Sequence, residues 1–148
     1  MINAADFPLS ELAEECARSF REPAELKKLR LRTEIQPGLT LCGNRAQIGQ
    51  LLSILLDNAI KYTPEGGDIE LSLKQEGRRI LRVKNTVNDT SVSPERFFDR
   101  FYRTDESRTQ KSGGFGIGLS AARAIAEQHH GTLTAGYEGD SIVFTLSL

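Results

Sequence analysis

Hydrophobic residues recur at spacings of three and four positions in three segments, which predicts three amphipathic helices. The first stripe begins just after Pro8, a residue suited to a first helical turn, and closes before Pro23. The second follows Asn44, which can cap a helix, and the third runs from a glycine-rich stretch at 113–118 to about His129. The second stripe is the most regular and predicts the central core helix; it consists of Ile48, Leu51, Leu52, Leu55, Leu56, Ala59 and Ile60.

Hydrophobic and polar residues alternate between these helices, which predicts β-strands. Turn residues separate the strands of each pair, and the expected strands cover residues 29–35, 39–42, 69–73, 80–83, 132–137 and 142–148. The order is helix, two strands, helix, two strands, a long loop, helix and two strands. This order predicts an α+β fold, a two-layer α/β sandwich in which about three helices cover one face of a mixed sheet of five or more strands.

Composition and charge narrow the classes of function. The chain has 148 residues, 39% of them hydrophobic, so we expect one domain over residues 6–148 after a short leader of residues 1–5. The 19 basic and 20 acidic residues give a net charge of -1, which argues against binding to nucleic acid or to an anionic membrane. No apolar run approaches the roughly 18 residues that cross a bilayer. Cys16 and Cys42 lack the spacing of a zinc site or a disulfide framework, which favours a cytoplasmic location.

Two polar residues near the end of the central helix are candidates for chemistry. Asn58 and Lys61 fall on one flank of the apolar stripe, where they can face a pocket beside the core. An amide oxygen suits Mg²⁺ and an ammonium suits phosphate. The alternative for these two residues alone is a solvated helix end.

The glycines at 113, 114, 116 and 118 allow the backbone to approach an anion, and the helix that follows would point its free N–H groups at it. This pattern indicates a phosphate-binding turn. A flexible connector is the other interpretation. Adjacent His129 and His130, just before Gly131, suit the capped end of a helix better than a metal site or a phosphorylation site.

Residues 86–112 lack periodicity, and a loop of this length within a domain is usually functional or mobile. Its aromatic residues indicate a segment that docks on the body of the domain, and its arginines can contact phosphate. A short amphipathic helix at the edge of the core explains the aromatics equally well, but not the arginines. The residues concerned are Phe97, Phe98, Phe101, Tyr102, Arg103 and Arg108.

These segments together resemble the catalytic and ATP-binding domain of sensor histidine kinases, in the superfamily that includes gyrase and the Hsp90 chaperones. Residues 51–64, LLSILLDNAIKYTP, resemble the asparagine box of that family. Residues 98–103, FDRFYR, resemble its phenylalanine box, and residues 114–119, GFGIGL, its second glycine box. The three motifs stand in the family's order, and the resemblance covers nearly the whole chain.

The resemblance implies the Bergerat ATP-binding fold, with ATP and Mg²⁺ as cofactors. It implies that Asn58 binds Mg²⁺, that Lys61 and Arg103 lie near the phosphates, and that these three residues are catalytic. Tyr62 would lie beside the adenine, and residues from about 88 to 112 would form the ATP lid. The other nucleotide-binding positions would be Gly114, Phe115, Gly116, Ile117, Gly118 and Leu119.

Two positions depart from the family pattern. Asn85 stands where the family usually has an Asp that binds the adenine, and the spaced glycines after it are missing, which should change how the lid hinges. The Asn85 amide can still accept a hydrogen bond from the adenine amino group. Ile54 stands where the hydrolytic relatives place a water-activating Glu, so we expect slow hydrolysis of ATP.

The resemblance also implies partners. The phosphoacceptor histidine of such kinases lies on a separate dimerising hairpin, and nothing before Asp6 could form it. We therefore expect a monomeric fragment of an ATP-dependent protein-histidine kinase that does not autophosphorylate alone. Its partners would be that dimerisation domain and the receiver domain of a response regulator, within a parent attached to the inner or plasma membrane.

Two other functions fit the same resemblance. One is a degenerate, nonenzymatic module that binds nucleotide weakly or only docks on a partner. The other is a serine kinase of the anti-sigma type, against which the phenylalanine-box segment argues.

Overall fold

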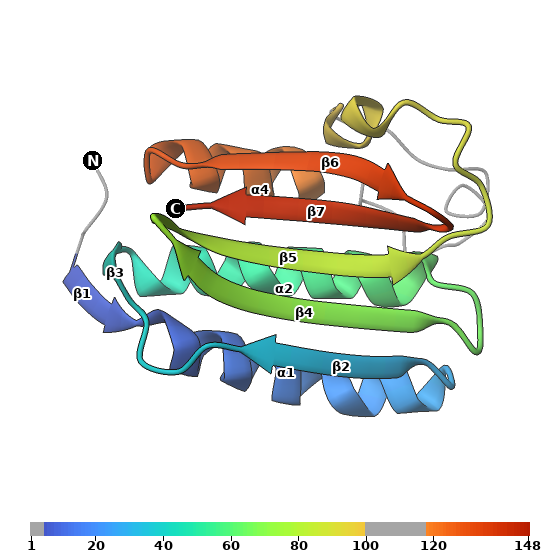
Figure 1. The fold of residues 1–148 in the computed structure, drawn as a ribbon, viewed down its shortest axis with the longest axis horizontal. Helices are drawn as coiled ribbons and strands as arrows, with labels where there is room; N and C mark the ends of the chain where they lie inside the picture. The colour runs from blue at the N-terminus through green and yellow to red at the C-terminus, as the bar shows by residue number, and fades with distance from the viewer. Residues whose placement is uncertain (1–4, 100–117) are drawn as a thin grey trace.

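The fold is a five-stranded mixed β-sheet with helices on one face, and the computed structural model describes residues 5–99 and 118–148 (Figure 1). The strand order is β2-β4-β5-β7-β6. The first pair, β2 and β4, is parallel, and the other pairs are antiparallel. The strands are β2 (Arg30–Ile35), β4 (Asp68–Glu76), β5 (Arg78–Thr86), β6 (Thr132–Glu138) and β7 (Ser141–Ser147).

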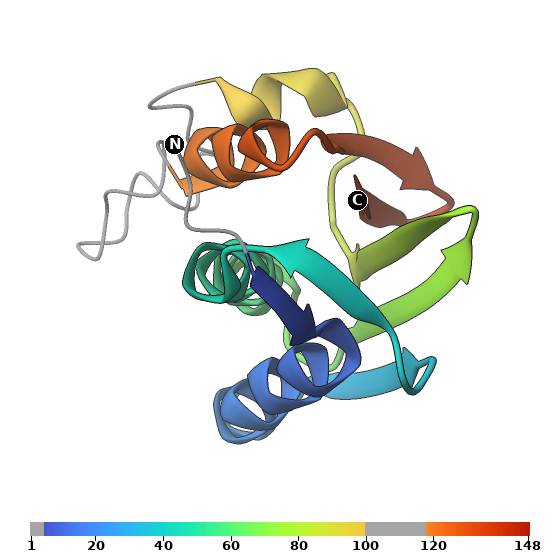
Figure 2. The same ribbon diagram turned by 90° about the vertical axis from the view of Figure 1, so that its left-hand side faces the viewer.

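Three α-helices of the described residues lie side by side on the same face of this sheet (Figure 2). They are α1 (Leu9–Leu26), α2 (Arg45–Tyr62) and α4 (Gly118–Gln128). Helix α2 is central and packs against both α1 and α4. The predicted two-layer α/β sandwich is therefore confirmed.

The core lies between the helices and the sheet, because each strand turns alternate residues toward the helices. In β4, Ile69, Leu71 and Leu73 are buried, whereas Glu70 and Ser72 lie on the other face. The apolar stripe of α2 is buried as predicted, with the exception of Ile60, which is only partly buried. Asn44 caps this helix, since its side chain accepts a hydrogen bond of 3.0 Å from the backbone N–H of Gln47.

The two predicted strands at 29–35 and 39–42 lie in different sheets. Strand β2 pairs with β4, whereas β3 (Thr40–Gly43) pairs with β1 (Ala5–Pro8) in a small antiparallel sheet. Gly38, at a φ of 80°, turns the chain between them. Strand β1 was not predicted, and Pro8, which was expected in the first turn of a helix, is the last residue of this strand and precedes α1.

The prediction that the first helix closes before Pro23 was wrong, because α1 continues to Leu26. A proline within a helix removes one backbone hydrogen bond and crowds the preceding turn. Here Ala24 is buried against the core, and the backbone N–H of Lys27 donates to the carbonyls of Pro23 and Ala24 at 3.3 and 3.2 Å. Burial and these bonds hold the last turn in place despite the proline.

Part of the aromatic segment packs on the sheet as a short 3₁₀ helix, η1 (Pro94–Phe98). The buried ring of Phe98 meets Phe144 of β7 edge to face, with 5.9 Å between the ring centroids. The guanidinium of Arg123 lies 3.7 Å from the centre of the Phe98 ring and forms an ion pair with Glu95. These contacts agree with a short helix that fills the edge of the core; Phe101 and Tyr102 lie outside the described residues.

Each outer strand of the sheet accepts hydrogen bonds from an arginine of a neighbouring helix. Arg21 of α1 donates to the carbonyl of Leu31 in β2 at 3.2 Å. Arg123 of α4 donates to the carbonyl of Leu133 in β6 at 3.0 and 3.1 Å. Each outer strand thus has one of its backbone acceptors bonded to a helix. In residues 5–99 and 118–148, no helix is both long enough and apolar enough to cross a membrane.

Candidate functional site

A cavity of about 160 Å³ opens between the second half of α2 and the start of α4. Helix α2 contributes one side of it and the amino end of α4 the other. The residues that line it are Ile54, Asp57, Asn58, Lys61, Tyr62, Gly118 and Leu119. Five of these are site residues that the sequence predicted, namely Asn58, Lys61, Tyr62, Gly118 and Leu119, and the fold brings them together from segments about 60 positions apart.

The α2 side of the cavity is half-buried and carries polar side chains next to the apolar Ile54. Asn58 and Lys61 lie one helical turn apart, so both side chains point to the same side of α2. The ammonium of Lys61 lies 2.9 Å from the carboxylate of Asp57, which also lines the cavity. Asp57 was not among the predicted site residues, although its spacing of four from Lys61 is typical of an ion pair on a helix.

The α4 side of the cavity lies toward the amino end of this helix, because it is lined by Gly118 and Leu119, the first described residues of α4. The first N–H groups of a helix have no partner within it, and the helix dipole makes this end positive. Together with the ammonium of Lys61, this end gives the cavity the groups that bind an anion.

Residues of the cavity also fit a hydrated Mg²⁺. Asn58 offers an amide oxygen and Asp57 a half-exposed carboxylate, which are the hard ligands that this ion prefers. Among the described residues no group of three His, Cys, Asp or Glu side chains could hold a metal. A magnesium ion here would therefore take most of its ligands from water and from a phosphate-bearing ligand.

Asn85 does not line this cavity and is almost completely buried in β5, against which α2 packs. Its amide Nδ2 donates to the carbonyl of Thr86 at 3.1 Å. Its Oδ1 is buried and has no hydrogen-bond partner among the described residues. A buried acceptor without a partner is rare and costly, so Asn85 is suited to receive a donor from a ligand.

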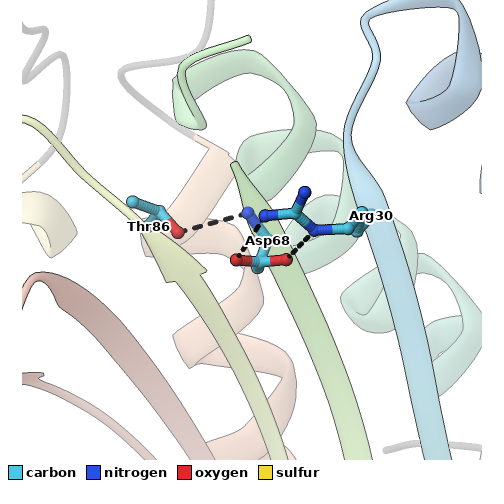
Figure 3. A network of polar contacts seen from close by, with 3 residues as sticks. All are labelled: Arg30, Asp68 and Thr86. Atoms are coloured by element: carbon cyan, nitrogen blue, oxygen red, sulfur yellow. Dashed lines mark hydrogen bonds and ion pairs between the residues drawn. The ribbon is translucent and has the colours of Figure 1, made fainter. Parts of the chain in front are cut away.

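Next to Asn85, a polar network joins the ends of three neighbouring strands (Figure 3). Arg30 of β2 donates to both carboxylate oxygens of Asp68 in β4, at 2.6 and 3.2 Å. The backbone N–H of Asp68 donates to the hydroxyl of Thr86 at 3.2 Å. The hydrogen bond from Arg30 holds the pKa of the Asp68 carboxyl below its ordinary value.

The remaining predicted residues lie elsewhere. His129 stands at the opposite end of α4, where its Nδ1 lies 2.9 Å from the carbonyl of Ile125, so it caps the helix as expected. Arg103, Gly114, Phe115, Gly116 and Ile117 lie outside the described residues. A larger hollow of about 450 Å³ lies on the open face of the sheet, but its lining mixes acidic and basic side chains and includes none of the predicted residues.

Comparison with known proteins assigns the family. The model of the histidine kinase-, DNA gyrase B-, and HSP90-like ATPases matches residues 43–148, and the chain belongs to this family. Within this family, the curated relatives that the chain matches are sensor histidine kinases, and its structural neighbours include the catalytic domains of histidine kinases, in agreement with the three motifs.

The relatives support this assignment. The signal transduction histidine-protein kinase BaeS of Escherichia coli (strain K12) is 35% identical over 152 residues, which cover 97% of this chain and 32% of BaeS. The chain thus spans about a third of the length of such relatives. The catalytic domain of histidine kinase ThkA has a TM-score of 0.85 at 25% identity, covering 99% of this chain and 95% of that one.

Two further structures share the fold. Full-length ShkA in complex with AMPPNP has a TM-score of 0.83 at 23% identity, over 99% of this chain and 31% of ShkA. ThkA in complex with response regulator protein TrrA has a TM-score of 0.83 at 24% identity, over 99% of this chain and 42% of that one.

Proposed function

We propose that this domain binds Mg-ATP in the cavity between α2 and α4 and donates the γ-phosphoryl group to a histidine on a separate dimerisation domain. The observation that carries the proposal is the meeting of Asn58, Lys61 and Tyr62 with the amino end of α4 around one cavity. The fold shared with ShkA, whose structure holds AMPPNP, supports a nucleotide as the ligand.

The proposed roles follow from the chemistry of each group. Asn58 holds Mg²⁺ through its amide oxygen, and Lys61 neutralises phosphate charge. Tyr62 lies beside the adenine. Arg103 and the backbone of residues 114–119 complete the binding of the phosphates. Phosphoryl transfer depends mainly on positioning and charge neutralisation, so this set needs no covalent catalytic residue.

In this proposal the adenine extends beyond the cavity to the buried Asn85 of β5, and this residue makes the site selective for adenine over guanine. The Nδ2 of Asn85 donates to the carbonyl of Thr86. If the amide were turned by half a rotation, Oδ1 would face that carbonyl oxygen, and two acceptors cannot form a hydrogen bond. The amide therefore keeps its acceptor, Oδ1, available. The exocyclic amino group of adenine can donate to that oxygen, whereas the exocyclic carbonyl of guanine cannot.

The partners follow from the same function. A phosphoacceptor histidine reaches the γ-phosphate from a dimerisation domain of the same parent protein, and residues 6–148 act as the catalytic unit. The phosphoryl group then passes to the receiver domain of a response regulator. The existence of a ThkA complex with response regulator TrrA supports this kind of partner. The parent is a sensor protein attached to the inner or plasma membrane.

Calorimetric titration with AMPPNP and Mg²⁺ tests the binding step. We expect saturable binding that requires Mg²⁺, weakens in Asn58→Ala, and greatly exceeds binding of the guanine analogue. Gln50→Ala, an exposed change on the same helix, is the matched control and should bind as the wild type does. No binding at millimolar nucleotide would contradict the proposal and favour a docking module. Transfer is tested by adding the purified phosphoacceptor domain and radiolabelled ATP.

A further inference from the structure

The end of α2, which carries three of the proposed ATP-binding residues, is held by a side chain from outside the cavity. The ammonium of Lys27, just after α1, donates to the backbone carbonyls of Ile60 and Lys61 at 2.7 and 2.9 Å. Thr63 donates through its backbone N–H and its hydroxyl to the carbonyl of Ala59, at 3.0 and 2.5 Å. Three consecutive carbonyls of the last turn of α2 thus have partners that are not part of the helix.

These bonds matter because of where the helix ends. The last carbonyls of a helix have no intrahelical partners, and they form the negative end of its dipole. Lys61 and Tyr62 extend from this turn, and Asn58 lies one turn earlier. A negative helix end next to bound phosphates raises the free energy of the complex, and an ammonium on its carbonyls offsets that effect.

Lys27 is itself fixed by the chain around it. The backbone N–H of Lys28 donates to Glu25 at 2.9 Å, and that of Leu29 to Ala24 at 2.9 Å, so the chain turns tightly after α1. Lys28 has a left-handed backbone with a φ of 63°. Its carbonyl accepts a hydrogen bond of 3.2 Å from Gly66, in the loop that follows α2. The turn after α1 therefore holds both the end of α2 and the loop beyond it.

We propose that Lys27 is a positioning residue of the ATP site, which fixes the last turn of α2 and thereby places the ammonium of Lys61 for the nucleotide's phosphates. Lys27 does not line the cavity, so it acts through the backbone of α2. This inference rests on the proposed function.

Titration of Mg-AMPPNP, Mg-ADP and adenosine against Lys27→Met tests it. We expect on the order of tenfold weaker binding of both phosphate-bearing ligands, from the loss of hydrogen bonds by a charged donor, and little change for adenosine. Lys27→Arg should restore most of the affinity. Lys28→Met is the matched control, because the Lys28 side chain is exposed and its ion pair among the described residues is a long one, with Glu65 at 3.8 Å.

A double-mutant cycle separates positioning from general loosening of the fold. If Lys27 acts through Lys61, Lys27→Met should cost little more affinity once Lys61 is already Met. Equal affinity of wild type and Lys27→Met would overturn the role of Lys27 alone. An equal loss for adenosine and AMPPNP would also overturn it and assign Lys27 to fold stability. A wild type that binds none of the three ligands would overturn the proposed function, and this inference with it.

Discussion

The imidazole of His129 accepts a hydrogen bond of 3.0 Å at Nε2 from the backbone N–H of Asn44, and so joins the end of α4 to the start of α2. Because Nε2 accepts, the ring proton is on Nδ1, which donates to the carbonyl of Ile125 at 2.9 Å. The two helices that form the cavity are thus tied together at the ends remote from it.

Replacement of His129 by Ala should therefore destabilise the domain. Two hydrogen bonds are lost, and we expect a decrease of about 1–3 kcal/mol in the free energy of unfolding, measured by urea denaturation. His130→Asn is a suitable control, because His130 is exposed and its φ of 59° is one that Asn tolerates. Equal stability of His129→Ala and wild type would mean that water replaces the imidazole.

Gly43 should tolerate no side chain while His129 is present. A Cβ at this position would lie 2.6 Å from Cδ2 of the His129 ring and 2.8 Å from its Nε2. We expect Gly43→Ala to cost roughly 1–3 kcal/mol through this clash. In the His129→Ala background the cost should largely disappear, so the two changes should be non-additive in urea denaturation. Additive losses would show that another contact excludes the methyl group.

Replacement of the proline inside α1 should stabilise the domain. Pro23 cannot donate to the carbonyl four residues earlier, and its side chain is exposed, so an alanine restores the bond without a change in the core. We expect Pro23→Ala to raise the free energy of unfolding by roughly 1–2 kcal/mol, after allowance for the greater entropy of its unfolded chain. Glu22→Ala controls for helix propensity alone. A loss of stability in Pro23→Ala would assign the proline a packing role.

The ion pair of Arg30 and Asp68 should contribute to stability only while Asp68 is ionised. Since Arg30 lowers the pKa of Asp68 in the folded state, the contribution is fully present above the ordinary carboxyl pKa of about 4. It is lost as the pH falls through the lower, folded-state value. The gap in stability between wild type and Asp68→Asn should therefore be present at pH 7 and shrink in acid. Glu34→Gln, on the same face of the sheet, is the control, and a gap independent of pH would contradict the expectation.

The sequence predicted most of the large elements because burial controls them. The stripe of α2 and the alternation in β4 are direct consequences of a one-sided core, so the helix layer and the main sheet could be recognised. The strand at 39–42 was predicted, but β1 and its pairing with β3 were missed, because β1 has only four residues and pairs across more than 30 positions. At Pro23, tertiary packing outweighed a local signal.

The candidate site, like the fold, could be predicted from the sequence only in part. Motif resemblance indicated Asn58, Lys61 and Tyr62, and the fold brings them to the amino end of α4. The supporting contacts could not be predicted, because they join distant parts of the chain. Lys27 lies more than 30 positions from the carbonyls that it binds, and His129 lies 85 positions from Asn44. No local pattern encodes such pairs.

The arginines on the two outer strands have a consequence for how copies of this domain behave when they are crowded together. An uncovered outer strand offers a row of backbone donors and acceptors to which another chain can add a strand. Arg21 and Arg123 each occupy one of these acceptors and keep a helix over the strand. Neither outer strand therefore offers a complete row of free backbone acceptors, which disfavours the joining of two sheets into one when copies of this domain are concentrated.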